Sequence, residues 1–355
     1  MHFGILKFRE TYMPRLWGGD KLKRVLNRKI YATGAIGEAW LISDHPACES
    51  VVAEGEFAGE TLRALMDSDG VSLLGSLAKP TVHGRFPLLL KLIDAGDVLS
   101  VQVHPDDEQA ARLGEADAGK TEMWHVLDAD SDSVMISGLR DGVTREAVFE
   151  ALSSGDISRL VRSFPVAAGD SVFVAAGSAH AIGAGILLAE IQQNSNVTYR
   201  IFDWNRLDDQ GAPRELHIEK ALSALSFENA RSGRAAPLRY TESGIPREVL
   251  AACRHFAAER ITVKKHGDFH SDARSFCVVL ALDDVMTIVA ENSGCVLERG
   301  EAALIPACIS EWRVEGAGGI MRYYVPDIAV DIVEPLLRHG YDEEQIRLLT
   351  RLQTT

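Results

Sequence analysis

Two ten-residue segments of this chain resemble each other in pattern. Residues 167–176 read AAGDSVFVAA and residues 298–307 read ERGEAALIPA. In each copy a glycine and an acidic residue precede a short apolar run, which is typical of a tight turn that enters a buried β-strand. An internal repeat at this spacing indicates two related structural units. We therefore expect a mainly β protein with two related β-barrel lobes.

The composition narrows the classes of partner. The chain has 355 residues, 46% of them hydrophobic, which is enough for one large core or two moderate ones. Its formal net charge of −14 argues against nucleic acid and anionic membranes, because both bind a basic face. A small phosphorylated substrate is still compatible, since a few local lysines or arginines suffice to bind it.

The cysteines and the N-terminus bear on the compartment. The five cysteines are scattered, with no Cys-x-x-Cys pair, as expected for reduced thiols in the cytoplasm. Residues 1–10 carry charges where a signal peptide needs an apolar run, and no stretch of about 18 apolar residues is present. We expect a cytoplasmic protein.

Two candidate metal ligands lie on one predicted strand. Residues 98–104 alternate in the manner of a half-buried strand, and residues two apart on a strand face the same side. Gln102 and His104 therefore project side by side, as does Ser100. Glu122 follows after a turn-rich segment, and His180 ends the strand that contains the first repeat copy.

Two imidazoles, a carboxylate and an amide oxygen on neighbouring strands of one sheet form a plausible cradle for a divalent metal. This ligand set suits zinc, and iron or manganese would also fit. Either histidine alone could instead be a core residue with satisfied hydrogen bonds. The second repeat copy has Glu311 in the place of His180, so we expect only one lobe to keep metal ligands.

These residues occur within a longer series of motifs that resembles the type I mannose-6-phosphate isomerases, in particular their shorter bacterial branch. The motifs follow the order of that family over about the first two-thirds of the chain. They are residues 16–19, 37–40, 87–91, 100–105, 119–122, 169–180, 193–200 and 214–217.

The resemblance implies a zinc-dependent cupin enzyme that interconverts mannose 6-phosphate and fructose 6-phosphate. The proton moves between C1 and C2 through an enediol. One Zn²⁺ per chain is expected, and the implied ligands are Gln102, His104, Glu122 and His180. A divalent metal would polarise the carbonyl and stabilise the developing oxyanion.

The resemblance also implies the catalytic residues. Arg200 occupies the position of the family's catalytic arginine, where a permanent charge suits oxyanion or phosphate stabilisation. Lys120 lies two residues before Glu122 and shares its face, and Glu190 matches a family acid in an apolar strand. The base stays open among Glu190, Lys120 and a metal-bound water. The structural alternatives are an ion pair for Arg200 and a solvated surface position for Lys120.

Ser100 and Lys91 match family positions near the substrate phosphate. Lys91 lies in an otherwise apolar strand, which requires a partner or a function. The alternative for Lys91 is a side chain that extends to the surface.

The lobes are expected to follow the chain. Residues 1–235 would form the catalytic metal-binding lobe, with helical segments near 144–162 and 215–226. Residues 236–327 would form the metal-free lobe, and residues 328–355 a helical tail that either packs on this lobe or serves an oligomer contact.

Other functions are compatible with parts of the pattern. A non-catalytic sugar-phosphate-binding cupin and an isomerase of another aldose phosphate are alternatives. An Fe(II) cupin oxygenase is a third, but such sites usually carry a histidine where Gln102 lies. The expected partner is a small sugar phosphate, and the oligomeric state is left open.

Overall fold

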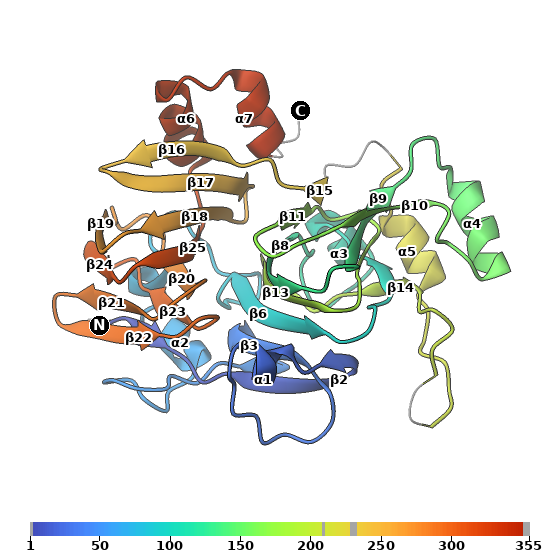
Figure 1. Ribbon diagram of the computed structural model, residues 1–355, viewed down its shortest axis with the longest axis horizontal. Helices are drawn as coiled ribbons and strands as arrows, with labels where there is room; N and C mark the ends of the chain where they lie inside the picture. Colours follow the sequence, from blue (N-terminus) through green and yellow to red (C-terminus); the bar gives the residue numbers. More distant parts are fainter. Residues whose placement is uncertain (1–2, 208–209, 228–232, 351–355) are drawn as a thin grey trace. The chain divides into compact units, whose positions relative to one another are not determined.

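The computed structural model describes residues 3–207, 210–227 and 233–350 and contains two compact units (Figure 1). Unit 1 comprises Met1–Thr11, Trp40–Leu90 and Ala235–Thr355, and unit 2 comprises Tyr12–Ala39 and Lys91–Arg234. Residue 235, where we expect the first lobe to end, coincides with the passage from unit 2 to unit 1. Residues 1–11 and 40–90 also belong to unit 1, although they come early in the chain.

Two β-sheets form the framework to which most of unit 2 belongs. The larger sheet has the order β15 (Gly233–Arg234), β11 (Ser171–Val174), β8 (Glu122–Ala129), β13 (Ile186–Gln193), β6 (Leu88–Ala95), β2 (Thr11–Gly19) and β3 (Ile36–Ile42). The smaller sheet has the order β10 (Val161–Pro165), β9 (Val134–Leu139), β12 (His180–Ile182), β7 (Val101–Val103) and β14 (Tyr199–Phe202).

The core of unit 2 lies between these sheets. Trp124 and Val126 of β8 are buried in the same apolar cluster as Met135 of β9 and Ile182 of β12. Alternating strand residues therefore face a shared interior, as in a sandwich. The expectation of a mainly β fold is confirmed. Each lobe is a pair of open sheets rather than a closed barrel, because the two sheets share no strand.

Unit 1 repeats this plan. One sheet has the order β1 (Leu6–Lys7), β23 (Ala302–Ile305), β20 (Cys277–Ala281), β25 (Gly318–Tyr324), β18 (Ala257–Val263), β17 (Ile245–Ala252) and β16 (Leu238–Glu242). A second sheet has the order β19 (His266–His270), β24 (Glu311–Glu315), β21 (Met286–Ala290) and β22 (Ser293–Leu297), and β4 (Asp44–His45) pairs with β5 (Cys48–Glu49). Phe269 of β19 and Val279 of β20 lie in one core cluster, so this unit is also a sandwich.

Short helices accompany unit 2. They are α1 (Lys21–Arg24), α3 (Asp107–Arg112), α4 (Arg145–Ser154) and α5 (Ile218–Ala224). The helix expected over 144–162 begins as predicted, because the Thr144 side chain accepts a hydrogen bond from the Ala147 amide. It ends earlier than expected, at Gly155, whose φ of 77° is the left-handed conformation that terminates helices. Residues 161–165 form β10 instead.

The C-terminal tail packs on unit 1. Unit 1 also contains α2 (Leu62–Leu74), the π-helix η1 (Ile328–Val333), α6 (Glu334–Arg338) and α7 (Glu343–Thr350). Leu336, Ile346 and Leu349 are buried in one cluster with Val249 of β17, and α6 and α7 lie beside β16 and β17 in Figure 1. Among the described residues, no helix is long and apolar enough to cross a membrane.

Candidate metal centre

The smaller sheet of unit 2 brings together residues that are far apart in the sequence. His180, the first residue of β12, pairs directly with Gln102 of β7. Gln102 pairs on its other side with Arg200 of β14. Directly paired residues of antiparallel strands project from the same face of a sheet. Gln102, His180 and Arg200 therefore share one face.

Both candidate histidine ligands present Nε2 to the same space. His104 donates its Nδ1 proton to the Val197 carbonyl at 2.7 Å, and His180 donates its Nδ1 proton to the Ser178 carbonyl at 2.9 Å. Each ring therefore keeps a lone pair on Nε2. A backbone carbonyl that fixes the histidine tautomer in this way is a regular feature of metal-binding histidines.

Glu122 completes the group from β8 of the larger sheet, so the expectation that all the ligands lie on one sheet is wrong. Its Oε1 lies 3.4 Å from Nε2 of His180, and its Oε2 lies 3.6 Å from Nε2 of His104. In the part of the chain that the structure describes, these residues form a buried group whose ligand atoms all lie within 4.8 Å of one another. Neither Glu122 oxygen accepts a hydrogen bond of normal geometry from another described residue.

A divalent cation fits this arrangement. Two imidazole lone pairs and a buried carboxylate converge on one point, and these are donors that bind divalent metals in proteins. The Gln102 amide nitrogen lies 3.2 Å from Nε2 of His180. A half-turn of the amide about its terminal bond would present Oε1 to the same point. Gln102 can therefore serve as a fourth ligand.

Lysines and a second buried glutamate border this group. Lys120 Nζ lies 2.5 Å from Oε2 of Glu122, 3.2 Å from Nε2 of His104 and 3.5 Å from Oε1 of Glu190. The same Glu190 oxygen lies 3.0 Å from Nζ of Lys91. Lys91 is 6% exposed, so its predicted alternative as a side chain extended to the surface is wrong.

Burial and charge shift the pKa values in opposite directions. Burial, reinforced by the Glu190 charge, raises the pKa of Glu122 to about 7. Burial also disfavours ionisation of Glu190, but Lys120 and Lys91 outweigh it and lower the pKa of Glu190 to about 2. Burial lowers the pKa of His180 to about 4 and that of His104 well below its usual value. Both imidazoles are therefore neutral at pH 7, as ligands must be.

Arg200 and Ser100 stand apart from this contact network. The Arg200 Nη1 donates to the Glu215 carbonyl at 2.9 Å, just before α5. Its Nε is buried and has no partner among the described residues. Ser100 is 3% exposed and lies two positions before Gln102. Strand pairing places Arg200 on the same sheet face as Gln102, and Ser100 directly precedes β7.

Two further residues support the network and were not singled out in the sequence. The Trp124 indole donates to Oε2 of Glu190 at 2.9 Å, and its ring meets that of His180 edge-on. Glu38 accepts from Arg15 at 2.8 Å and lies 3.8 Å from Nζ of Lys91. Trp124 lies two residues after Glu122, so the strand period could have indicated its shared face.

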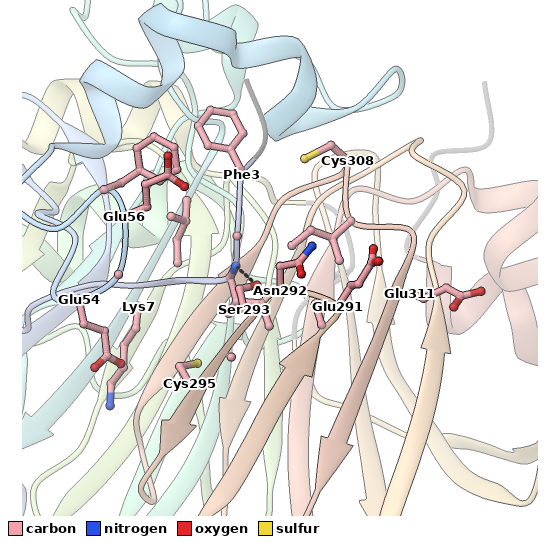
Figure 2. Close-up of a pocket in the computed structure, with 18 of the residues that line it drawn as sticks. Phe3, Lys7, Glu54, Glu56, Glu291, Asn292, Ser293, Cys295, Cys308 and Glu311 are labelled. Atoms are coloured by element: carbon pink, nitrogen blue, oxygen red, sulfur yellow. Dashed lines mark hydrogen bonds between the residues drawn. The ribbon is translucent and has the colours of Figure 1, made fainter.

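Unit 1 contains a hollow that is lined by none of the predicted site residues. It has a volume of about 780 Å³ and is bordered by the N-terminal strand segment, residues 54–57 and the turn between β21 and β22 (Figure 2). Figure 2 shows Glu54, Glu56 and Glu291 around it, and Lys7 is paired with Glu301 at 2.7 Å. Carboxylates spread around an open hollow are ordinary surface features.

Several known proteins are similar to this chain in sequence and in fold. The family model "Phosphomannose isomerase type I, catalytic domain" matches residues 5–137. A mannose-6-phosphate isomerase of Streptococcus mutans is 35% identical over 303 residues, which cover 85% of this chain and 92% of that protein. A mannose-6-phosphate isomerase of Bacillus subtilis is 30% identical over 311 residues, with coverages of 88% and 96%.

The solved structures agree with the sequence relatives. The crystal structure of the mannose 6-phosphate isomerase from Bacillus subtilis has a TM-score of 0.81 and 29% identity, and the match covers 90% of this chain and 99% of that one. The fold and the buried cluster define a cupin with one candidate metal centre. The chain belongs to the type I phosphomannose isomerase family.

Proposed function

We propose that this chain is an aldose–ketose isomerase that interconverts mannose 6-phosphate and fructose 6-phosphate. The observation that carries the proposal is the convergence of His104, Glu122 and His180 beside Lys120 and Glu190. The two relatives from Streptococcus mutans and Bacillus subtilis are both mannose-6-phosphate isomerases, which supports the same substrate.

We propose that the resident metal is a single Zn²⁺ held by His104, His180, Glu122 and Gln102. Zinc accepts this mixture of nitrogen and oxygen donors, and a site without thiolates is typical of catalytic rather than structural zinc. When bound, it would act as a Lewis acid that makes the hydrogen next to the substrate carbonyl more acidic.

The roles of Lys120 and Glu190 follow from their charges. With a pKa of about 2, Glu190 is a weak proton acceptor at neutral pH. It fits better as the counter-ion that holds Lys91 and Lys120 in place, at 3.0 and 3.5 Å. We propose that Lys120, which adjoins both Glu122 and His104, moves the proton between C1 and C2: its neutral amine accepts the proton from one carbon, and the resulting ammonium returns it to the other.

Cationic and hydroxyl groups near the cluster are suited to the anionic parts of the substrate. Arg200 shares the sheet face of Gln102, and its always-charged guanidinium can stabilise an oxyanion or contact the phosphate. Lys91 and Ser100 are proposed to bind the phosphate. The ammonium of Lys91 is held in a charged form, because Glu190 and Glu38 outweigh its burial and raise its pKa.

We further propose that the protein acts in the cytoplasm on this small sugar phosphate, in keeping with its acidic charge. A coupled assay that detects fructose 6-phosphate tests the function, with mannose 6-phosphate compared against other aldose 6-phosphates. Turnover of mannose 6-phosphate above the others supports the proposal. Turnover of another aldose phosphate alone, or binding without turnover by zinc-loaded protein, contradicts it.

A further inference from the structure

The repeat allows positions in the two lobes to be matched strand by strand. In the repeat, Val174 of β11 corresponds to Ile305 of β23. Val174 pairs with Glu122 across β8, and Ile305 pairs with Cys277 across β20. Cys277 therefore occupies the position in unit 1 that Glu122 occupies in unit 2.

The next strand extends the match. Trp124 and Val279 each lie two residues after the positions just matched, on β8 and β20 respectively. Trp124 pairs with Glu190 of β13, whereas Val279 pairs with Arg322 of β25. Arg322 therefore takes the place of Glu190, and a buried negative charge becomes a positive one.

The side chain that forms the ion pair with this residue also has the opposite charge in the two lobes. In unit 2, Glu190 contacts Lys91 of the adjacent strand β6. In unit 1, Arg322 pairs across the strands with Glu259 of β18, and the guanidinium lies 3.4 Å from that carboxylate. The two lobes therefore carry the same kind of ion pair at matching strands with the charges reversed.

A hollow in unit 1 is bordered by Cys277 and Arg322, the counterparts of Glu122 and Glu190. Gln102 pairs with His180, and their counterparts His270 and Glu311 pair across β19 and β24 but are exposed. The hollow of about 230 Å³ is lined by His270 together with Asp272, Cys277 and Arg322 among others.

Arg322, which lines this hollow, belongs to an ion-pair network around Glu259. Glu259 is shared between Arg322 and Arg247, at 3.4 and 3.5 Å, and it accepts a hydrogen bond from Tyr324 at 2.9 Å. Burial raises the pKa of the Cys277 thiol to about 11 and that of Tyr324 well above its usual value, so both stay neutral. One buried carboxylate thus faces two guanidinium groups.

The other ion pairs of this network balance its charge. Arg247 also contacts Glu242 at 2.9 Å, and neither of these residues lines the hollow. Neither Nε of Arg247 nor that of Arg322 has an oxygen acceptor among the described residues. At the rim, Asp272 and Asp331 are both paired with Arg274.

We propose that this hollow is a second ligand site, which takes a small oxyanion-bearing molecule with Arg322 as its anchor. A guanidinium matches phosphate and carboxylate oxygens in a bidentate fashion. A partly desolvated arginine strengthens that contact because the local dielectric is low. The hollow suits a ligand smaller than a drug-sized molecule, and the paired Asp272 and Arg274 at its rim offer acceptors and donors to hydroxyl groups.

The experiment is calorimetric titration of the full-length, zinc-loaded protein with inorganic phosphate and, separately, with acetate. The two titrations distinguish a phosphate site from a carboxylate site. The double variant Glu259→Gln/Arg322→Gln removes the anchoring guanidinium together with its buried counter-ion, so the net charge is unchanged and no unpaired carboxylate is left behind. We expect the double variant to bind the anion at least tenfold more weakly than the wild type at one site per chain. Anion binding at any other site should be unchanged. The matched control is Arg313→Gln, an exposed arginine of β24 that is paired with Asp268.

Phosphate and acetate binding that is the same in wild type and in the double variant would overturn the proposal, as would binding of neither anion to the wild type. If the double variant does not fold, Arg322→Lys provides the test, since it keeps the charge beside Glu259 but loses the bidentate geometry. We then expect a several-fold weaker affinity at an unchanged melting temperature, and an unchanged affinity would reject the anchor role.

Discussion

The interiors of the two lobes use matching strands for opposite chemistry. In unit 2 the buried group contains the carboxylates of Glu38, Glu122 and Glu190 and the ammonium groups of Lys91 and Lys120. Arg15 pairs with Glu38, and the group of His104, Glu122 and His180 could hold a divalent cation. In unit 1 the matching ion pair has the opposite orientation, with Arg322 at the position of Glu190 and in contact with Glu259.

The comparison teaches that the sandwich alone does not determine the chemistry. Matching strands are neighbours in both lobes, but the ion pair between them is reversed, and the ligands that we propose for the two lobes differ in charge. Function therefore has to be argued from the site and not from the fold. The predictions below set residues of the two lobes against each other.

The largest effect is expected for His104→Ala. The substitution removes one of two neutral imidazoles whose Nε2 faces Glu122, so bound zinc should fall from one per chain to none. Turnover should fall by at least about 10²–10³-fold. Elemental analysis and the coupled isomerase assay measure the two quantities. Stoichiometric zinc in the variant would contradict the ligand assignment.

A strong effect on turnover alone is expected for Arg200→Ala. The guanidinium lies on the sheet face of Gln102 but not among the proposed metal ligands, so zinc should stay bound. We expect kcat to fall by about 10²-fold, as for loss of a single group that stabilises an oxyanion. Wild-type kcat would show that Arg200 is structural.

A smaller effect is expected for Trp124→Phe. The change keeps an aromatic ring but removes the N–H donor to Glu190. A hydrogen bond to a charged group contributes about 1.5–3 kcal/mol, so kcat should fall by about tenfold or more. We expect zinc content and KM to change little. A lower melting temperature with unchanged kcat would assign Trp124 to stability alone.

Acid should weaken the folded state of metal-free protein in a defined pH window. The pKa of His180 is about 4 when folded and about 6.5 when unfolded, so the unfolded chain binds more protons between these values. The contribution of His180 to stability should therefore decrease as the pH falls from about 6.5 to about 4. Glu122, whose folded pKa of about 7 lies above its unfolded value, opposes this change above about pH 4.5. Below about 4.5, Glu190 should add to the loss as it is protonated toward its folded pKa of about 2.

Denaturant unfolding of the metal-free protein at several pH values measures this dependence. The variant His180→Gln is the matched comparison, since it keeps a polar side chain without the titration. Its stability should decline less between pH 6.5 and pH 4. The same slope in both proteins would contradict the role given to His180.

The smallest effect is expected for Glu311→Ala, at the counterpart of His180 in unit 1. The side chain is exposed on β24. Zinc content and kcat should stay within about twofold of wild type, because surface substitutions of this kind change stability by about 0.5 kcal/mol or less. Loss of zinc would show that the two lobes are not as different as their buried charges indicate.

The sequence predicts the strands and the metal cluster well for a physical reason. The strand period of two puts Gln102 and His104 on one face. The expectation that His180 ends the strand of the preceding apolar run is wrong, because that run forms β11 and His180 begins β12 in the other sheet. Histidines and a carboxylate within apolar strand segments indicate a site, because these side chains need partners when they are buried. The mainly β fold follows from the same alternation and from the repeat.

Long-range contacts could not be read from the sequence. The indole of Trp124 bonds to Glu190 across two strands, and the Glu38 carboxylate approaches Lys91 from another part of the chain. Local patterns do not reveal such pairings. The end of α4 at Gly155 was also missed, although a glycine at that position is a recognised stop signal. The reversed ion pair of unit 1 becomes visible only when strand registers are compared.

The most direct measurement is the coupled assay on mannose 6-phosphate with protein that has been stripped by a chelator and then reloaded with zinc. The account predicts that the stripped protein stays folded but inactive, and that one zinc per chain restores the formation of fructose 6-phosphate. Full activity of the stripped protein, or no activity of folded protein containing one zinc per chain, would contradict it.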